Sequence, residues 1–352
     1  MDSRSQTIDA VRLFCNLLVV LLHASAAFQY VPRQGVEYGV WSFLCGGLAP
    51  VLLPTLFFLS GYLLFRNYTN AVYGRKIWSR VKRLAVPYLA WNALFVAVYL
   101  VFSAVVPRLA IRVNQFGLDT LAGCVEKVAS LTVHPIDGPL WFVRTLFVFA
   151  LFASVLVWLF RKLPVWAVGG LVVLLIGGTA LFPQQAEAMR MTYPAYALVA
   201  FMAGGYAATY SFDVFAFFRR FRWPCLVVSL AAMVGRFAFQ EYSGPVHPTV
   251  QTVLLLLTIP LFWTVAEPLT RLLSARWIQT WVMPASFFIY AGHFLFASTL
   301  LHLVAPHLPF THGKLTVLCL IFVGLGIPVC VLAYWIGRRI APRLIKIFDA
   351  TL

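Results

Sequence analysis

Two ionisable residues in the first long apolar run have a spacing that could support chemistry. Arg12 and His23 are eleven residues apart, so on a helix their side chains point to within roughly 20° of each other, about 16 Å apart along the axis. Asp9 and Asn16 lie on the same stripe. Ionisable side chains in membrane spans are costly and often mark a function. A structural Asp9–Arg12 pair would explain Arg12 but not His23, whose neutral imidazole can take a proton from a hydroxyl group.

A second group of polar and aromatic residues is spread over later apolar runs. Trp141 and Arg144 belong to the stretch GPLWFVRTL, Arg236 lies near the end of another run, and His293 belongs to SFFIYAGHFL. If the N-terminus is inside, all of these fall at mid-membrane or toward the outer side, where a polar pocket with aromatic walls would suit a sugar-like ligand. For most of the aromatic residues in the sequence, however, we prefer the alternative interpretation that they lie at the membrane–water interface rather than on a pocket wall.

A third candidate region is the basic segment 66–83, which holds six Lys and Arg residues and no acidic residue. Lys76, Arg80 and Arg83 recur at helical spacing. Such a ridge can bind phosphate groups, because Arg pairs with phosphate through two parallel hydrogen bonds; contact with anionic lipid headgroups is the alternative. The sequence contains no P-loop and no GxGxxG pattern, so nucleotide hydrolysis and dinucleotide binding are unsupported.

The elements that must position these residues are membrane helices. The 352 residues are 62% hydrophobic and 11% charged, with a mean hydropathy of +0.87, whereas a soluble domain has about 45–50% apolar and roughly 25% charged residues. Open sheets cannot span lipid. We therefore predict an all-α, polytopic membrane bundle of about ten transmembrane helices, forming a single domain over residues 1–352. The predicted spans are 8–30, 40–65, 84–106, 140–160, 164–183, 193–210, 223–240, 248–267, 283–304 and 315–340.

The distribution of charge predicts the orientation of the bundle. With the N-terminus inside, nineteen of the 27 Lys and Arg residues fall in inner segments and six in outer ones, which indicates cytoplasmic termini. The net charge of +16 therefore gives no reason to expect a nucleic-acid partner. The N-terminus does not resemble a cleavable signal peptide. The six cysteines show no metal-binding spacing, so we expect neither a metal site nor a disulfide.

Several stretches together resemble the acyltransferase-3 family of bacterial integral membrane O-acyltransferases. They are IDAVRLFCNLLVVLLHA, LFFLSGYLLFRN, KIWSRVKRLAVPYLAWN, GPLWFVRTLF and SFFIYAGHFL, and the resemblance runs over most of the chain. Its most specific marks are Arg12 and His23 with ten residues between them, and the Arg-x-x-Arg formed by Arg80 and Arg83.

The resemblance implies a reaction and a location. Members of the family transfer an acyl group, usually acetyl, from cytosolic acyl-CoA to a hydroxyl of a cell-surface carbohydrate or of its lipid-linked precursor. The chain would then lie in the bacterial cytoplasmic (inner) membrane, surrounded by lipid. Acetyl-CoA would be a co-substrate, and no bound cofactor is expected.

The resemblance also implies roles for residues. His23 is expected to be the catalytic residue, with Arg12 of the same motif. Arg80 and Arg83, with Lys76 on the same ridge, are expected to bind the CoA phosphates. Two further residues, Trp141 and Arg144, lie in a stretch that the family associates with its active cavity, and Arg144 could stabilise a developing oxyanion. Arg236 and His293 remain pocket candidates from their positions alone.

Two other functions stay open at this stage. A membrane exporter or transporter of a glycan or small metabolite could line its pathway with the same polar stripe, although no inverted repeat or pair of broken helices is visible. An unrelated family of membrane-bound O-acyltransferases also uses an intramembrane histidine, but the position of His23 in the first run does not favour it. The acceptor, the acyl length and the oligomeric state are not indicated.

Overall fold

The computed structural model describes residues 3–103, 117–130, 133–182, 184–185, 194–240, 247–309 and 312–350. Its regular structure is helical, and no strand occurs among these residues, which confirms the all-α prediction. The principal helices are α1 (Ser3–His23), α2 (Gly35–Ser42), α3 (Leu52–Phe65), α4 (Tyr73–Arg80), α5 (Val86–Ser103), α7 (Leu121–Ala129), α8 (Trp141–Leu151), α9 (Ala153–Lys162), α10 (Val165–Leu181), α12 (Ala195–Thr209), α13 (Val214–Arg220), α14 (Arg222–Ala238), α15 (His247–Leu256), α16 (Ile259–Thr264), α17 (Ala266–Leu272), α18 (Ser286–Val304), α19 (Lys314–Ile340) and α20 (Pro342–Phe348).

Ten helical segments of the described structure correspond to the ten predicted spans. Five continuous segments are long and apolar enough to cross a membrane, and three bent pairs raise this number to as many as eight. The two shorter apolar helices, α10 and α12, correspond to the remaining predictions. The protein is therefore a multi-pass membrane protein, while the number of ten crossings and the cytoplasmic position of both termini stay predictions. The five continuous segments are Gln6–Tyr30, Gly35–Phe65, Tyr73–Ser103, Ile278–His307 and Lys314–Ile340.

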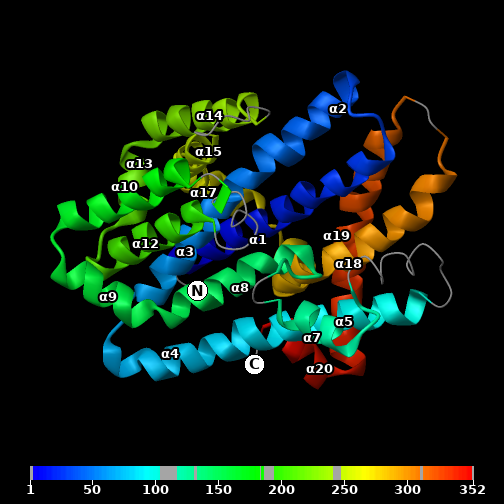
Figure 1. The fold of residues 1–352 in the computed structure, drawn as a ribbon, viewed down its shortest axis with the longest axis horizontal. Helices are drawn as coiled ribbons and strands as arrows, with labels where there is room; N and C mark the ends of the chain where they lie inside the picture. Colours follow the sequence, from blue (N-terminus) through cyan, green and yellow to red (C-terminus); the bar gives the residue numbers. More distant parts are fainter. Residues whose placement is uncertain are drawn as a thin grey trace.

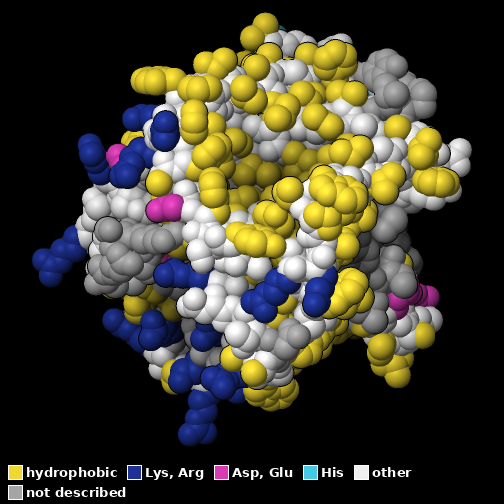
Figure 2. Space-filling view, turned by 90° about the vertical axis from the view of Figure 1, so that its left-hand side faces the viewer, with side chains coloured by type: hydrophobic (Ala, Val, Ile, Leu, Met, Phe, Trp, Pro, Cys, Tyr) yellow, Lys and Arg dark blue, Asp and Glu magenta, His cyan; other side chains and the backbone are white. Residues whose placement is uncertain are grey.

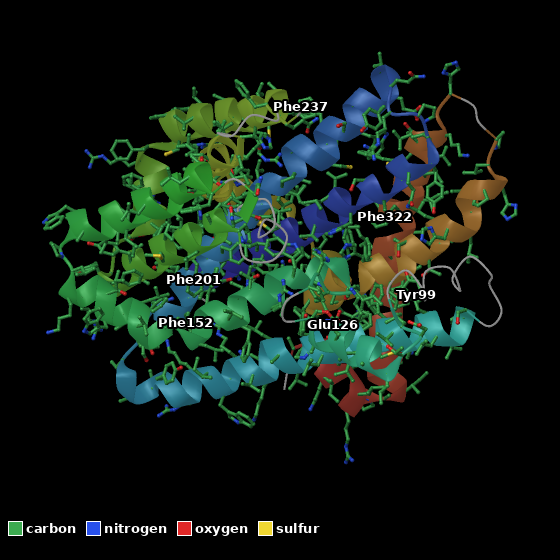
Figure 3. The ribbon with its side chains drawn as sticks, viewed as in Figure 1. Tyr99, Glu126, Phe152, Phe201, Phe237 and Phe322 are labelled. Carbon is green, nitrogen blue, oxygen red and sulfur yellow. The ribbon has the colours of Figure 1, made fainter. Side chains whose placement is uncertain are left out.

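The three bent pairs depart from the straight helices that the apolar pattern predicts. Two bends, of 87° between α13 and α14 and of 55° between α16 and α17, have a proline, Pro224 or Pro268, in the first turn of the second helix. Proline removes one backbone hydrogen bond and clashes with the carbonyl four residues earlier, which places each break where it is observed. The third bend, of 57° between α8 and α9, lies at the exposed Phe152 (Figure 3) and has no such proline.

Helices α3 and α12 approach each other closely through glycine. A Cβ atom added to Gly61 would lie 2.1 Å from the backbone oxygen of Phe201, and one added to Gly204 would lie 1.9 Å from the backbone oxygen of Phe58. Small residues allow such backbone contact between membrane helices. This closely packed pair lies beside α1 and α8, with which α3 is in contact (Figure 1).

The basic segment is largely helical and continuous with the third span. Helix α4, a π-helical turn at Val81–Ala85 and α5 form one run from Tyr73 to Ser103. The span predicted at 84–106 therefore begins earlier, because the basic residues occur at helical spacing rather than in a loop. Figure 2 shows Lys and Arg side chains gathered toward the lower left of one face, whereas hydrophobic side chains surround a hollow above them.

Helix α1 runs through the middle of the bundle, where it packs against α3, α17, α18 and α19 (Figure 1). Asn16 fixes it to α18, because its side-chain amide donates hydrogen bonds to the hydroxyl of Ser286 (2.8 Å) and to the Ser286 carbonyl oxygen (3.2 Å). The predicted polar stripe of α1 thus faces protein at this point, and the contact sets where the end of α1 lies relative to α18.

Candidate active site

Two histidines from distant parts of the chain meet where α1 ends. His23 is the last residue of α1, and His293 lies fully buried in α18. Their ring centroids are 5.2 Å apart, and Nε2 of His293 lies 3.4 Å from Nδ1 of His23. Phe322 of α19, which is labelled in Figure 3, packs against His293, and the two ring centroids are 6.2 Å apart. The two histidines therefore form one unit within a largely apolar environment.

The hydrogen bonds of this pair assign the tautomers. Nδ1 of His23 lies 2.8 Å from the carbonyl oxygen of Val19, and Nδ1 of His293 lies 2.8 Å from that of Tyr290. A carbonyl oxygen only accepts hydrogen bonds, so in the neutral rings both protons reside on Nδ1. Nε2 of His293 then accepts weakly from the Nδ1–H of His23, and Nε2 of His23 is left as a base. The hydrogen bond that one ring nitrogen donates thus determines that the other nitrogen is unprotonated and can act as a base.

A third histidine, His134, lies beside the pair in the loop that precedes α8. His134 and His23 line the same cavity, and Nδ1 of His134 lies 3.1 Å from the carbonyl oxygen of Pro135. The same tautomer argument leaves Nε2 of His134 unprotonated. Burial lowers the pKa of the His134 imidazole, and the positive charges of Arg144 and Lys127 act in the same direction. We therefore expect His134 to be neutral at physiological pH.

The same loop carries a buried acid, Asp137. Its backbone N–H donates to Oδ1 of Asn92 at 3.1 Å, but neither carboxylate oxygen has a hydrogen-bond partner among the described residues. Burial raises the pKa of this carboxyl group well above its ordinary value. Nearby, the hydroxyl of Tyr290 donates to the carbonyl oxygen of Pro139, so α18 is connected to the start of α8.

His23 and His134 line a cavity of about 1120 Å³. Trp141 lies on its wall, and so does Arg236, whose Nη1 donates to the carbonyl oxygen of Gly46. His293 lies behind His23 and is not a lining residue. The cavity extends from the end of α1 to helices α10, α12, α14 and α15. Most of its volume therefore lies away from the histidine pair.

Arg144 does not line the cavity and instead holds the loop in place. The side chain is buried, and its Nη1 donates to the carbonyl oxygens of Ser130 and Val133, the latter at 2.6 Å. It thereby links α8 to the segment immediately before His134. This geometry favours a structural contribution to the position of His134 over direct contact with a substrate.

Three arginines gather near the start of α1 rather than at the histidine pair. The charge of Arg80 interacts with those of Arg12 and Arg83, and Arg12 interacts with Arg83 and Asp9 as well. Arg12 and Arg83 are exposed and Arg80 is partly buried. The structure therefore does not bring Arg12 to His23: the two remain eleven residues apart on one helix, about 16 Å along its axis.

Lys76 lies next to this group but is engaged elsewhere. Its ammonium group donates to the carbonyl oxygens of Leu64 (2.6 Å) and Arg66 (3.0 Å) and lies 5.5 Å from the ring centroid of Tyr68. A cation at the last carbonyls of a helix stabilises that end. Lys76 therefore stabilises the C-terminal end of α3. Of the basic residues in the ridge, Arg80 and Arg83 are the two that lie near Arg12.

Sequence reasoning singled out His23 and His293 separately but not their contact, and it missed His134 and Asp137. Both missed residues precede the GPLWFVRTL stretch by a few positions. That stretch was the available signal, because a loop entering a predicted pocket brings its last residues to the pocket wall.

Comparison with protein families yields one match, covering residues 6–336, and the matched family is described as an acyltransferase domain. The matched region includes every residue of the histidine pair, the cavity wall and the arginine group named above. No curated protein and no solved structure matches the chain.

Proposed function

The chain belongs to the acyltransferase-3 family, and from this premise we propose that it transfers an acetyl group from cytosolic acetyl-CoA to a hydroxyl group of a cell-surface carbohydrate or lipid-linked glycan precursor. The single observation that carries the proposal is the geometry of α1. One end of this helix lies in a group of three arginines, two of them exposed, and its other end presents an oriented histidine to a large cavity. A donor and an acceptor could therefore approach the same helix from opposite ends.

His23 acts in this proposal as the general base. Its Nε2 removes the proton of the acceptor hydroxyl, and the oxygen attacks the thioester carbonyl carbon. As the tetrahedral intermediate collapses, the carbon–sulfur bond breaks, and the imidazolium returns the proton to the departing CoA thiolate. The reaction consumes one hydroxyl and one thioester and yields one ester and one thiol, so no further reactant is needed. Held by Val19 and His293, the His23 ring begins the reaction in the required tautomer.

The arginine group is the proposed binding site for the acyl donor, acetyl-CoA. Coenzyme A carries a pyrophosphate and a further phosphate, and Arg binds phosphate with paired hydrogen bonds. Arg12, Arg80 and Arg83 have like charges close together, and an anion relieves the repulsion among them. Arg12 thus becomes a donor-binding residue. About 16 Å separates it from His23 along α1, a distance that the extended pantetheine arm of CoA would cover.

The proposed setting is the bacterial cytoplasmic membrane, with the arginine group on the cytoplasmic side, where CoA is available. The predicted positive-inside orientation supports this arrangement. Trp141 and Arg236 on the cavity wall would contact the acceptor.

The reaction class can be tested with purified protein, isotopically labelled acetyl-CoA and cell-envelope fractions. We expect mass spectrometry to find a glycan-containing product heavier by one labelled acetyl group, together with one free CoA thiol per transfer. Movement of a glycan or metabolite into liposomes without acyl-CoA, and without CoA release, would instead support a transporter.

A further inference from the structure

One region of the cavity wall is mainly apolar. The lining side chains from α3, α8, α10 and α12 are mostly aliphatic and aromatic, whereas α14 and α15 add the polar residues Arg236, His247, Gln251 and Thr252. The apolar side chains include Leu53, Leu56, Phe149, Leu175 and Leu198. A sugar placed against these side chains would leave its hydroxyl groups without hydrogen bonds, which is unfavourable. A hydrocarbon chain would fit without that penalty.

Helix α10 lines this apolar region and also lies at the outside of the molecule. Only Val168 and Thr179 of its seventeen residues are buried. Leu174 lines the cavity and is nevertheless 73% exposed, so the cavity reaches the outer surface along this helix. The neighbouring exposed residues Val173 and Leu181 are also aliphatic, as expected for a surface in contact with lipid tails.

The inner side of α10 leaves unfilled space at glycine. Gly178 lines the cavity, and a Cβ atom added there, or at Gly177, would meet nothing within 4 Å. Between α10 and α15, the hydroxyl groups of Thr179 and Thr249 share a hydrogen bond of 2.7 Å. This hydrogen bond therefore joins α10 to α15.

We propose that the acceptor is a membrane-resident amphiphile, whose hydroxyl-bearing head lies at His23 and whose hydrocarbon chain lies in the apolar region against Gly178. The chain enters from the bilayer between α10 and α15. This inference rests on the proposed function and specifies its acceptor. Lateral entry suits such a molecule because its chain passes from lipid into an apolar cavity without crossing water. Arg236 and Gln251 also line the cavity, where we expect them to contact a polar or anionic head.

The acceptor class is tested by partitioning the labelled products. Protein in nanodiscs is incubated with labelled acetyl-CoA and cell-envelope extract, and the products are divided between chloroform–methanol and water. We expect the label in the organic phase, on an amphiphile. Label confined to water-soluble glycans would overturn this inference and leave the proposed function intact. Absence of label from both phases would count against the acyltransferase reaction itself.

A matched pair of variants tests the position of the chain. Gly178→Leu fills the apolar region, whereas Gly170→Leu adds the same side chain to the same helix at a position that does not line the cavity and also has open space. Gly178→Leu should lower transfer at least tenfold and leave acetyl-CoA binding unchanged, while Gly170→Leu should transfer at the wild-type rate. Wild-type transfer by Gly178→Leu would overturn the proposal.

Cross-linking tests the route of entry. The adjacent hydroxyl groups allow Thr179→Cys and Thr249→Cys to be combined so that a disulfide joins α10 to α15. Oxidation of this double variant should stop transfer to the amphiphile, and a reductant should restore it, whereas the single variant Thr179→Cys should not respond. An oxidised, fully cross-linked protein that transfers at the wild-type rate would exclude entry between these helices.

Discussion

Replacement of His293 by alanine tests how His23 is held. The substitution removes a hydrogen bond to Nδ1–H of His23, at 3.4 Å, but the shorter bond from the same group to the Val19 carbonyl oxygen, at 2.8 Å, remains. A single neutral hydrogen bond contributes about 0.5–1.5 kcal/mol, which corresponds to about a two- to twelvefold change in rate. Loss of a general base itself costs about 10²–10⁴-fold. His293→Ala should therefore be clearly less damaging than His23→Ala.

The assay measures CoA release at varied acetyl-CoA concentration. We expect kcat to fall and the KM for acetyl-CoA to stay constant, because the arginine group lies about 16 Å along α1 from His23. His293→Gln should recover part of the lost rate, since its amide oxygen can accept from the Nδ1–H of His23. Melting temperature in detergent serves as the folding control. A loss equal to that of His23→Ala at unchanged melting temperature would refute the assignment of His293 as a positioning residue, and so would a glutamine variant no better than alanine.

Three further perturbations follow from the structure. Burial raises the pKa of Asp137 in the folded state, so the free energy of unfolding should fall as pH rises above the unfolded pKa of about 3.9. Asp137→Asn should lack this loss. The melting temperature of the variant should therefore increasingly exceed that of the wild type between about pH 5 and pH 8. Gly204→Ala puts a Cβ atom within 1.9 Å of a backbone oxygen and should destabilise the protein by about 1–3 kcal/mol or more, whereas Gly170→Ala, with open space, should be neutral or slightly stabilising in the same denaturation assay. Arg83→Gln should raise the KM for acetyl-CoA about three- to tenfold at low salt and less at high salt, with a smaller effect for Arg75→Gln; equal effects of the two would contradict a specific phosphate site.

The helical fold was predictable because its main determinant is local. Long apolar runs separated by short polar segments indicate membrane helices, and each predicted run corresponds to a helix, a bent pair or a shorter helix. The bends at Phe221 and Val265 could also have been predicted, since Pro224 and Pro268 follow three residues later. The bend at Phe152 could not, because no residue near it breaks a helix and the packing of α8 and α9 must determine it.

The site was predictable only where its residues share one helix. Helical periodicity puts Arg12 and His23 on one stripe, but it does not show what faces them. The partner of His23 is His293, 270 residues away, and that pairing depends on how α1 packs against α18. The burial of Asp137 could not be predicted from the sequence for a similar reason. It depends on the position of the loop before α8, to which Arg144 donates a hydrogen bond.

The measurement that tests the central claim most directly is acetyl transfer by His23→Ala, compared with wild type in the same nanodiscs. His23 as general base predicts a loss of about 10²–10⁴-fold in CoA release and in acetylated product, with unchanged melting temperature and acetyl-CoA affinity. Transfer at a rate near that of wild type would contradict the mechanism and remove His23 from the reaction.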